Sequence, residues 1–229
     1  MKQNIVVLSG AGISAESGLG TFRDNGGLWE RYKIEDVATP DAWARNPDLV
    51  RDFYNLRRKE ALAAQPNEAH RQLVRLEEKF NVNIVTQNVD ALHERAGSTN
   101  VLHLHGELNK LCSQTKPDYI VPIEGWEQTK DMKDDDGTPL RPFIVWFGEA
   151  VPNIDRAIAL CRAADVLIVV GTSLNVYPAA GLKDYCNKGC RKYFIDPKSP
   201  QGGLPSGFQH IKDVASQGIR TIVDLLTAE

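Results

Sequence analysis

The chain has 229 residues, enough to bury a full hydrophobic core as one large domain or as a large domain with a smaller insertion. Its formal net charge of -3 gives no basic surplus, which argues against nucleic acid or an anionic membrane as the main partner. No apolar run is long enough to cross a membrane, and the four residues before the first apolar run are too few for a signal peptide, so we expect a cytoplasmic protein.

The first predicted element is a strand over residues 5–9, which ends in the glycine turn Gly10-Ala11-Gly12 and leads into a predicted helix. Glycines let the backbone approach a ligand closely, and amide groups at the start of a helix can bind an anion. Any α/β protein can use glycines in such a turn, so by itself the turn is compatible with packing as much as with a nucleotide site. The residues immediately downstream favour the nucleotide, because an aromatic and an arginine can close over an anion: Thr21, Phe22 and Arg23.

The next segment, residues 24–64, is predicted to be mostly helical and interrupts the alternation of strands and helices. Thr39 and Asn46 each precede a proline, which combines a capping side chain with a residue suited to the first helical position. Asn67 is predicted to cap a further helix over residues 68–80.

Five more short apolar runs predict strands at residues 82–86, 101–104, 143–147, 166–170 and 193–195. Most are separated by stretches with helical periodicity, which predicts an α/β fold with a Rossmann-like parallel sheet and helices on both of its faces. We expect a single domain over residues 1–229, in which the interrupting segments 25–65 and 109–141 meet as a smaller inserted module. The large part then comprises residues 1–24, 66–108 and 142–229.

Polar residues follow the second predicted strand, at the edge where open α/β sheets bind ligands. They are Gln87, Asn88, Val89 and Asp90. The same composition is typical of a turn that caps the next helix, so composition leaves both interpretations open.

His105 follows the third predicted strand and is a candidate general base. Histidine titrates near pH 6.5, so it can accept a proton at neutral pH, and the end of a strand holds it rigidly. His103 is placed on the same face of that strand, which makes a metal site with two histidines conceivable. No third ligand follows at a familiar spacing, which disfavours the metal.

Two further turns follow predicted strands. Gly148 and Glu149 come after the strand at residues 143–147, and Gly171-Thr172-Ser173 follows the most apolar strand. Polar or glycine-rich turns after several strands of one sheet are how a nucleotide crevice is assembled.

Taken in order, these motifs resemble the signature of the sirtuins, the NAD-dependent protein-lysine deacylases. The resemblance rests on residues 10–23, 86–90, 104–106, 145–149 and 171–173, and it extends from about residue 5 to residue 226. Within the family the chain is most similar to the bacterial members and to the class that removes negatively charged acyl groups.

The resemblance implies NAD as the cofactor and Asn88 and His105 as the catalytic residues. In the implied mechanism the acyl oxygen of a modified lysine attacks the nicotinamide ribose, nicotinamide leaves, and His105 then activates a ribose hydroxyl. The implied products are free lysine, nicotinamide and 2′-O-acyl-ADP-ribose. The implied NAD contacts are Gly10, Ala11, Gly12, Ala15, Glu16, Thr21, Phe22, Arg23, Trp29, Gln87, Asn88, Val89, Asp90, Gly171, Thr172, Ser173, Asp196, Pro197, Lys198 and Ala215.

The resemblance also implies a substrate strand edge that pairs with acylated-lysine proteins or peptides, a form of β-augmentation. The matching residues are Val145, Phe147, Gly148 and Glu149.

Tyr54 and Arg57 match the family's pair that binds the distal carboxylate of succinyl-lysine or malonyl-lysine. They are three residues apart on a predicted helix and project from nearly the same face. Without the family, they are better interpreted as an aromatic and a solvated arginine on a helix surface. Ala38 fits the same picture, because its small side chain leaves room for a longer acyl group.

One feature departs from many sirtuins, which hold a structural zinc with two cysteine pairs in the small module. Here Cys112 is the single cysteine between residues 109 and 142. The others, Cys161, Cys186 and Cys190, fall in predicted helices of the large part and are interpreted as core or surface thiols. We therefore predict no zinc and a module held by packing, through Tyr119, Ile120, Val121 and Trp126.

Two alternatives to a deacylase stay open. The first is a non-catalytic sensor module that binds NAD or ADP-ribose, and the presence of His105 and Asn88 argues against it. The second is a mono-ADP-ribosyltransferase or NAD hydrolase that uses the same crevice.

Overall fold

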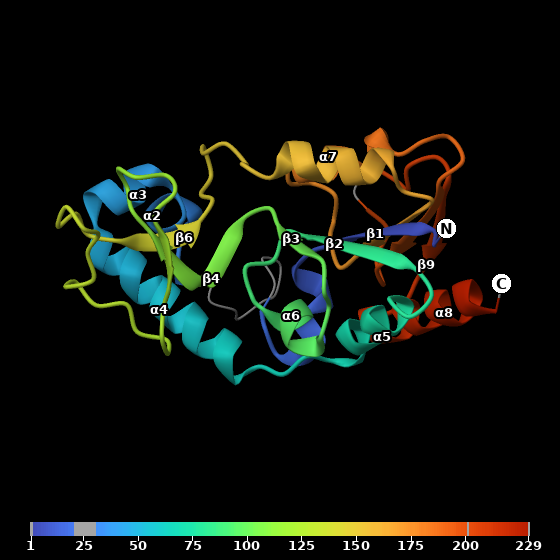
Figure 1. Ribbon diagram of the computed structural model, residues 1–229, viewed down its shortest axis with the longest axis horizontal. Helices are drawn as coiled ribbons and strands as arrows, with labels where there is room; N and C mark the ends of the chain where they lie inside the picture. The colour runs from blue at the N-terminus through green and yellow to red at the C-terminus, as the bar shows by residue number, and fades with distance from the viewer. Residues whose placement is uncertain (1, 21–30, 201, 229) are drawn as a thin grey trace.

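The computed structural model describes residues 2–20, 31–200 and 202–228 (Figure 1). Its larger part is a six-stranded sheet in the order β3-β2-β1-β7-β8-β9, in which every pair of neighbours is parallel. The strands are β1 (Asn4–Ser9), β2 (Asn81–Thr86), β3 (Val101–His103), β7 (Val166–Val170), β8 (Arg191–Ile195) and β9 (Phe208–Ile211). The predicted Rossmann-like parallel sheet is confirmed.

Helices cover both faces of this sheet because strand side chains alternate between the faces. Ile5 and Val7 share one hydrophobic cluster with α5 and α8, while Val6 and Leu8 share another with α7 and η3. Figure 1 shows α5 and α8 on one side of the sheet and α7 on the other. These helices and the short α6 are α5 (Glu68–Leu76), α6 (Leu92–Ala96), α7 (Ile154–Arg162), η3 (Ala179–Tyr185) and α8 (Ala215–Thr227).

A smaller lobe lies at the left of Figure 1 and packs helices against a three-stranded sheet in the order β5-β4-β6. One hydrophobic cluster joins them, from Val50 and Tyr54 on α4 to Leu108 on β4 and Trp146 after β6. The elements are α2 (Ile34–Val37), α3 (Pro40–Arg45), α4 (Pro47–Ala63), β4 (Gly106–Cys112), β5 (Ile120–Pro122) and β6 (Arg141–Ile144).

The prediction of a strand at residues 143–147 in the parallel sheet is wrong in both the bounds and the sheet. It forms as β6, pairs antiparallel with β4 and belongs to the small lobe instead of the parallel sheet. An apolar run indicates a buried strand, but it does not show which sheet the strand joins.

The predicted helix caps are confirmed. Thr39 accepts a hydrogen bond from the Ala42 amide at the start of α3, and Asn46 accepts one from the Leu49 amide at the start of α4. Asn67 forms a capping box at the start of α5.

Two other local expectations are wrong. The glycine turn after β1 leads into two short 3-10 turns, η1 (Ala11–Ile13) and η2 (Ala15–Ser17), instead of an α-helix. The second turn stops at Gly18, whose φ of 83° is left-handed. Cys186 and Cys190 lie outside helices, at the end of η3 and in the turn before β8.

Packing in the small lobe differs in part from the prediction. Leu111, Ile123 and Leu140 form a cluster with Tyr119 and Val121 at its edge, whereas Ile120 and Trp126 are exposed. Cys112 is buried on β4. In the part of the chain that the structure describes, no group of three or more His, Cys, Asp or Glu side chains could hold a metal ion. The absence of zinc stays a prediction.

A buried polar network built on Arg58 joins α4 to the rest of the small lobe. The guanidinium donates hydrogen bonds to the carbonyls of Leu108 and Trp126 and to the side-chain oxygen of Asn55. Asn55 in turn bonds both backbone groups of Gln128, at 3.0 Å and 2.8 Å. Burial lowers the pKa of Arg58 to about 10, so the side chain stays charged at neutral pH. This network ties three segments together without a metal.

Within the described ranges, no helix is both long and apolar enough to cross a membrane.

Replacing Arg58 by methionine should lower the free energy of unfolding by about 3 kcal/mol, because the Leu108 and Trp126 carbonyls and Asn55 lose their shared donor. Urea and thermal unfolding, followed by circular dichroism, measure the loss. Arg45→Met is the matched control, since Arg45 pairs with Asp36 on the exposed surface and such pairs contribute at most about 1 kcal/mol. Equal losses in the two variants would contradict the prediction.

Candidate functional site

The glycine turn after β1 packs directly on the turn after β7. The Gly10 amide donates to the Val170 carbonyl at 3.0 Å, and the Gly12 amide donates to the Gly171 carbonyl at 2.9 Å. A Cβ atom on Gly12 would lie 2.7 Å from the Gly171 Cα atom, and Gly171 itself has a φ of +63°. The glycines are therefore required by the close approach of two backbones. At Gly10 the φ is -129°, which any residue can adopt.

The backbone amides of this turn are already used within the protein. Besides those of Gly10 and Gly12, the Ile13 amide donates to the Gly10 carbonyl and the Ser14 amide to the Ala11 carbonyl. The expectation that these amides bind an anion is therefore wrong for these four groups. The three residues expected to close over the anion, Thr21, Phe22 and Arg23, lie outside the described residues, as does Trp29, another expected NAD contact.

Side chains from three turns meet at the carboxyl edge of the sheet. The Ser14 hydroxyl donates to Asp90 Oδ2 at 3.1 Å and accepts from Asn88 Nδ2 at 3.2 Å. Gln87 Nε2 donates to Thr172 Oγ1 at 3.1 Å. These contacts link the turns after β1, β2 and β7 into one polar cluster, and Asn88 and Asp90 within it are only 6% and 7% exposed. Sequence reasoning assigned no role to Ser14, and its place in the glycine motif is the only signal for it.

The two carboxylate oxygens of Asp90 have different partners. Its Oδ1 accepts from the Leu92 amide at the start of α6, while Oδ2 faces Ser14. Burial raises the pKa of Asp90, and the two hydrogen bonds oppose that rise. One carboxylate oxygen thus bonds the first residue of α6 while the other takes part in the cluster, and contact of Asp90 with a ligand stays a prediction.

His105 is presented in the form that a general base needs. Its Nδ1 lies 3.1 Å from the Gln87 carbonyl oxygen, a hydrogen bond that requires the ring proton on Nδ1 and leaves Nε2 as an acceptor. Burial lowers the pKa of His105 below its usual 6.5, against the weaker effect of the Gln87 carbonyl. The ring is therefore neutral at neutral pH.

His103 does not join His105 in a metal site. Its Nδ1 lies 2.9 Å from the Asn88 carbonyl oxygen, and its Nε2 lies 2.7 Å from Glu94 Oε1. Both nitrogens are occupied by protein acceptors, so the conceivable pair of histidine ligands does not form.

Tyr54 and Arg57 extend the candidate site into the small lobe. Tyr54 is buried, its hydroxyl accepts from Trp146 Nε1 at 3.1 Å, and burial raises its pKa to about 12. Arg57 is partly buried, with its guanidinium 5.9 Å from the centre of the Phe53 ring. Burial lowers the pKa of Arg57, and the charges of Tyr54 and Asp90 oppose this. Arg57 therefore lies close enough to Asp90 for their charges to interact, whereas Tyr54 is held by Trp146 in the core of the small lobe.

The segment after β6 runs beside His105. The Val145 amide donates to the His105 carbonyl at 3.0 Å, and the Phe147 amide donates to the Ala38 carbonyl at 3.0 Å. The Glu149 carboxylate turns inward, because it accepts from the Trp146 amide and forms a 2.8 Å ion pair with Arg141. Contact between this segment, including Gly148, and a substrate peptide stays a prediction.

The residues expected at the adenine end of NAD lie after β8 and at the start of α8. The Glu16 carboxylate accepts from the Ser216 amide at 2.9 Å and from its hydroxyl at 2.6 Å, which ties η2 to the first turn of α8 beside Ala215. Asp196 accepts from the Lys198 amide at 2.8 Å. Four other residues expected to contact NAD differ in exposure. Ala15 and Pro197 are exposed, and Val89 and Ser173 are partly buried.

The chemistry of this edge fits the ribose and amide groups of NAD, which need both donors and acceptors. It offers the carboxylate of Asp90, the amides of Gln87 and Asn88, the hydroxyl of Ser14 and the neutral imidazole of His105. All lie at the carboxyl ends of parallel strands, where open α/β sheets bind nucleotides.

Comparison with known proteins agrees with this geometry. The profile of the Sir2 family matches residues 10–178. The chain is 51% identical to an NAD-dependent protein deacylase of Bacteroides thetaiotaomicron over 98% of both chains, and 48% identical to one of Helicobacter pylori over 98% of this chain and 95% of that one. A solved Sir2 homologue mutant in complex with ADP-ribose superposes with a TM-score of 0.90 at 37% identity, covering 100% of this chain and 95% of its own. A Sir2 homologue–NAD complex superposes with a TM-score of 0.89 at 37% identity, covering 99% of this chain and 90% of its own.

The protein belongs to the Sir2 family, the sirtuins, as the motifs predict.

Gly12→Ala should destabilise the protein by about 1–3 kcal/mol, because the new Cβ atom meets backbone atoms that cannot move without separating β1 from β7. The melting temperature measures the effect. Gly189→Ala is the matched control, because a Cβ atom there has no neighbour within 4 Å. A melting temperature that falls equally in both variants would refute the packing explanation.

Proposed function

We propose that this sirtuin is an NAD-dependent protein-lysine deacylase that removes succinyl and malonyl groups, and also acetyl groups, from lysine side chains. The observation that carries the proposal is a neutral His105 with Nε2 as acceptor beside the buried cluster of Ser14, Asn88 and Asp90. The names of the relatives support it, since those from Bacteroides and Helicobacter are called NAD-dependent protein deacylases. A solved Sir2 complex that contains a p53 peptide and NAD supports a peptide substrate.

Bound NAD supplies an activated ribose carbon and a leaving group, nicotinamide. His105 takes up the proton of a ribose hydroxyl at Nε2, while the Gln87 carbonyl holds the other ring proton at Nδ1. Asn88 and Asp90, both fixed by Ser14, orient the ribose. Their burial limits access of water, which would otherwise hydrolyse the activated ribose.

The preference for acidic acyl groups rests on Arg57 and Tyr54. A carboxylate at the end of a succinyl or malonyl chain matches the planar fork of an arginine, and the high pKa of Tyr54 keeps its hydroxyl proton available as a second donor. The charge of Arg57 already acts on Asp90, so a carboxylate bound to Arg57 would lie beside the polar cluster. The small buried side chain of Ala38 lies in the same hydrophobic cluster as Tyr54.

Arg57→Met should lower kcat/KM for succinyl-lysine and malonyl-lysine peptides about 100-fold, the equivalent of about 3 kcal/mol for a lost charge-assisted hydrogen bond. The value for acetyl-lysine should change less than about threefold, since an acetyl group offers no carboxylate. Release of nicotinamide, measured with the three peptides, gives the comparison, and Tyr54→Phe should show the same pattern more weakly. An Arg57→Met variant that affects all three peptides equally would refute the acidic preference.

The same assay separates the alternatives. Binding of NAD without release of nicotinamide for any acyl peptide would indicate a sensor module. Nicotinamide released without a peptide would indicate an NAD hydrolase, and ADP-ribose found attached to protein by mass spectrometry would indicate a transferase.

The loss of kcat/KM at low pH should follow the protonation of His105. Because burial holds its pKa below 6.5, the ring stays neutral as the pH falls to that value, and kcat/KM should then fall about tenfold per pH unit below the lowered pKa. Initial rates between pH 5 and 8 measure the profile. A limb with its midpoint above 6.5 would contradict the assignment of His105 as base.

A further inference from the structure

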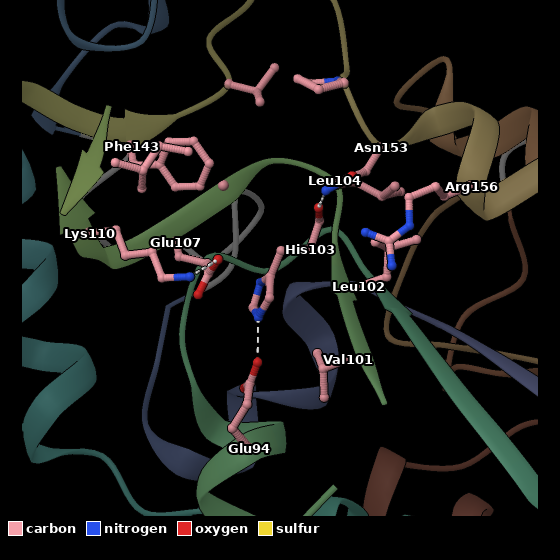
Figure 2. A pocket seen from close by; sticks show the side chains of 14 residues that line it. Glu94, Val101, Leu102, His103, Leu104, Glu107, Lys110, Phe143, Asn153 and Arg156 are labelled. Atoms are coloured by element: carbon pink, nitrogen blue, oxygen red, sulfur yellow. Dashed lines mark hydrogen bonds and ion pairs between the residues drawn. The ribbon is translucent and has the colours of Figure 1, made fainter. Parts of the chain in front are cut away.

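Both ring nitrogens of His103 face groups that can only accept hydrogen bonds. Nδ1 lies 2.9 Å from the Asn88 carbonyl oxygen and Nε2 lies 2.7 Å from a Glu94 carboxylate oxygen, as Figure 2 shows for Glu94. A neutral imidazole has one N–H and can serve only one of them. Two acceptors therefore require the imidazolium, so His103 carries a charge where His105, two residues away, does not.

The charges around His103 agree with this geometry. Burial alone would lower the pKa of His103, but the hydrogen bond and charge of Glu94, with smaller effects of the Asn88 carbonyl and Glu107, raise it above 6.5. Burial alone would raise the pKa of Glu94, and His103 lowers it instead. The remaining charged or titratable groups nearby come from four elements: Asp90 in the turn after β2, His93 on α6, Glu107 and Lys110 on β4, and Arg156 on α7.

His103 and Glu94 line a cavity of about 450 Å³ between β3, β4 and the start of α7 (Figure 2). Glu107 and Lys110 form a separate 2.8 Å ion pair in the same cavity. The Glu94 side chain is 39% exposed, whereas that of His103 is only 7% exposed. Glu94 therefore connects a buried cation to solvent.

Asn88 is held on three sides, and His103 provides one of them. Its backbone amide donates to Thr86 Oγ1 at 3.0 Å, and its side-chain Nδ2 donates to Ser14 Oγ at 3.2 Å. Its backbone carbonyl accepts from His103. Loss of the second ring proton would leave one N–H for two acceptors. The ionised Glu94 is the stronger acceptor, so the Asn88 carbonyl would lose its donor.

We propose that the His103–Glu94 pair is a positioning device for Asn88, in which the imidazolium fixes the Asn88 carbonyl and thereby sets the affinity of the site for NAD. The proposal rests on the role of Asn88 in the proposed function. Neither His103 nor Glu94 touches the reacting groups. They act through Asn88, and the proton on His103 makes the action dependent on pH.

The first test is a titration of the histidine rings by NMR in the full chain without NAD. His103 should titrate above pH 6.5 in the wild type, and Glu94→Gln should shift its midpoint down by about one pH unit or more, because the carboxylate charge is lost while a carbonyl acceptor remains. Glu107→Gln is the matched control, since it removes a carboxylate of the same cavity that does not touch the ring, and its shift should be smaller. A wild-type midpoint below 6.5 would overturn the proposal.

The second test is calorimetric binding of NAD without acyl peptide, at several pH values. In the wild type the Kd should rise about fivefold or more as the pH passes the His103 midpoint, and in Glu94→Gln this rise should move to lower pH by the shift seen in the NMR titration. His103→Gln should bind NAD weakly at every pH. An unchanged pH dependence in a Glu94→Gln protein whose His103 midpoint has moved would overturn the proposal.

Melting temperatures check that the variants are folded. Because the Glu94 side chain is partly exposed, Glu94→Gln should disturb the fold less than His103→Gln. Because the binding test needs no acyl transfer, a protein that binds NAD with the expected pH dependence but removes no acyl group would refute the proposed enzyme while supporting the role of His103 and Glu94.

Discussion

The contact between the glycine turns after β1 and β7 is the constraint on which the rest of the site depends. Two amides cross between the turns, and the gap between Gly12 and Gly171 leaves no room for a Cβ atom. This contact sets how closely the turn that carries Ser14 lies to the turn that carries Thr172. Ser14 and Thr172 then hold Asn88, Asp90 and Gln87 from the turn after β2. The glycines act by joining the ends of β1 and β7, and the polar side chains around them add the end of β2 and form the candidate site.

The two lobes use buried polar groups in different ways. In the small lobe the Arg58 network is purely internal and holds three segments of the chain together. At the sheet edge the polar groups bond one another and also set the charges of two histidines. His105 stays neutral and His103, two residues before it, is charged. The difference comes from the partners, because one ring faces a single carbonyl and the other faces a carbonyl and a carboxylate.

Much of the fold follows from local patterns in the sequence. Short apolar runs and capping residues predict β1, β2, β7 and the starts of α3, α4 and α5, because these depend on nearby residues. The place of β6 cannot be predicted from local patterns, because its partner β4 lies far away in the sequence and the two are brought together by packing. For the site, motif spacing identifies Asn88, Asp90 and His105. It misses the role of Ser14, which exists only once three turns meet in space, and the pairing of His103 with Glu94, which depends on how α6 packs beside β3. It also assigns the turn amides to an anion, although those of Gly10, Gly12, Ile13 and Ser14 are already bonded to the protein.

The position of β1 in the sheet has a consequence for synthesis of the chain. This strand lies in the middle, between β2 and β7, and Ser9 pairs with Thr86 on one side and Val170 on the other. Its turn is also tied to α8 through Glu16 and Ser216, which are 200 residues apart. Because β1 precedes both partners in the chain, it must wait for strands made later, and contacts of such long range form slowly. Until then the four apolar residues 5–8 of β1 lack the neighbouring strands that bury them in the finished fold, and such exposed segments favour aggregation.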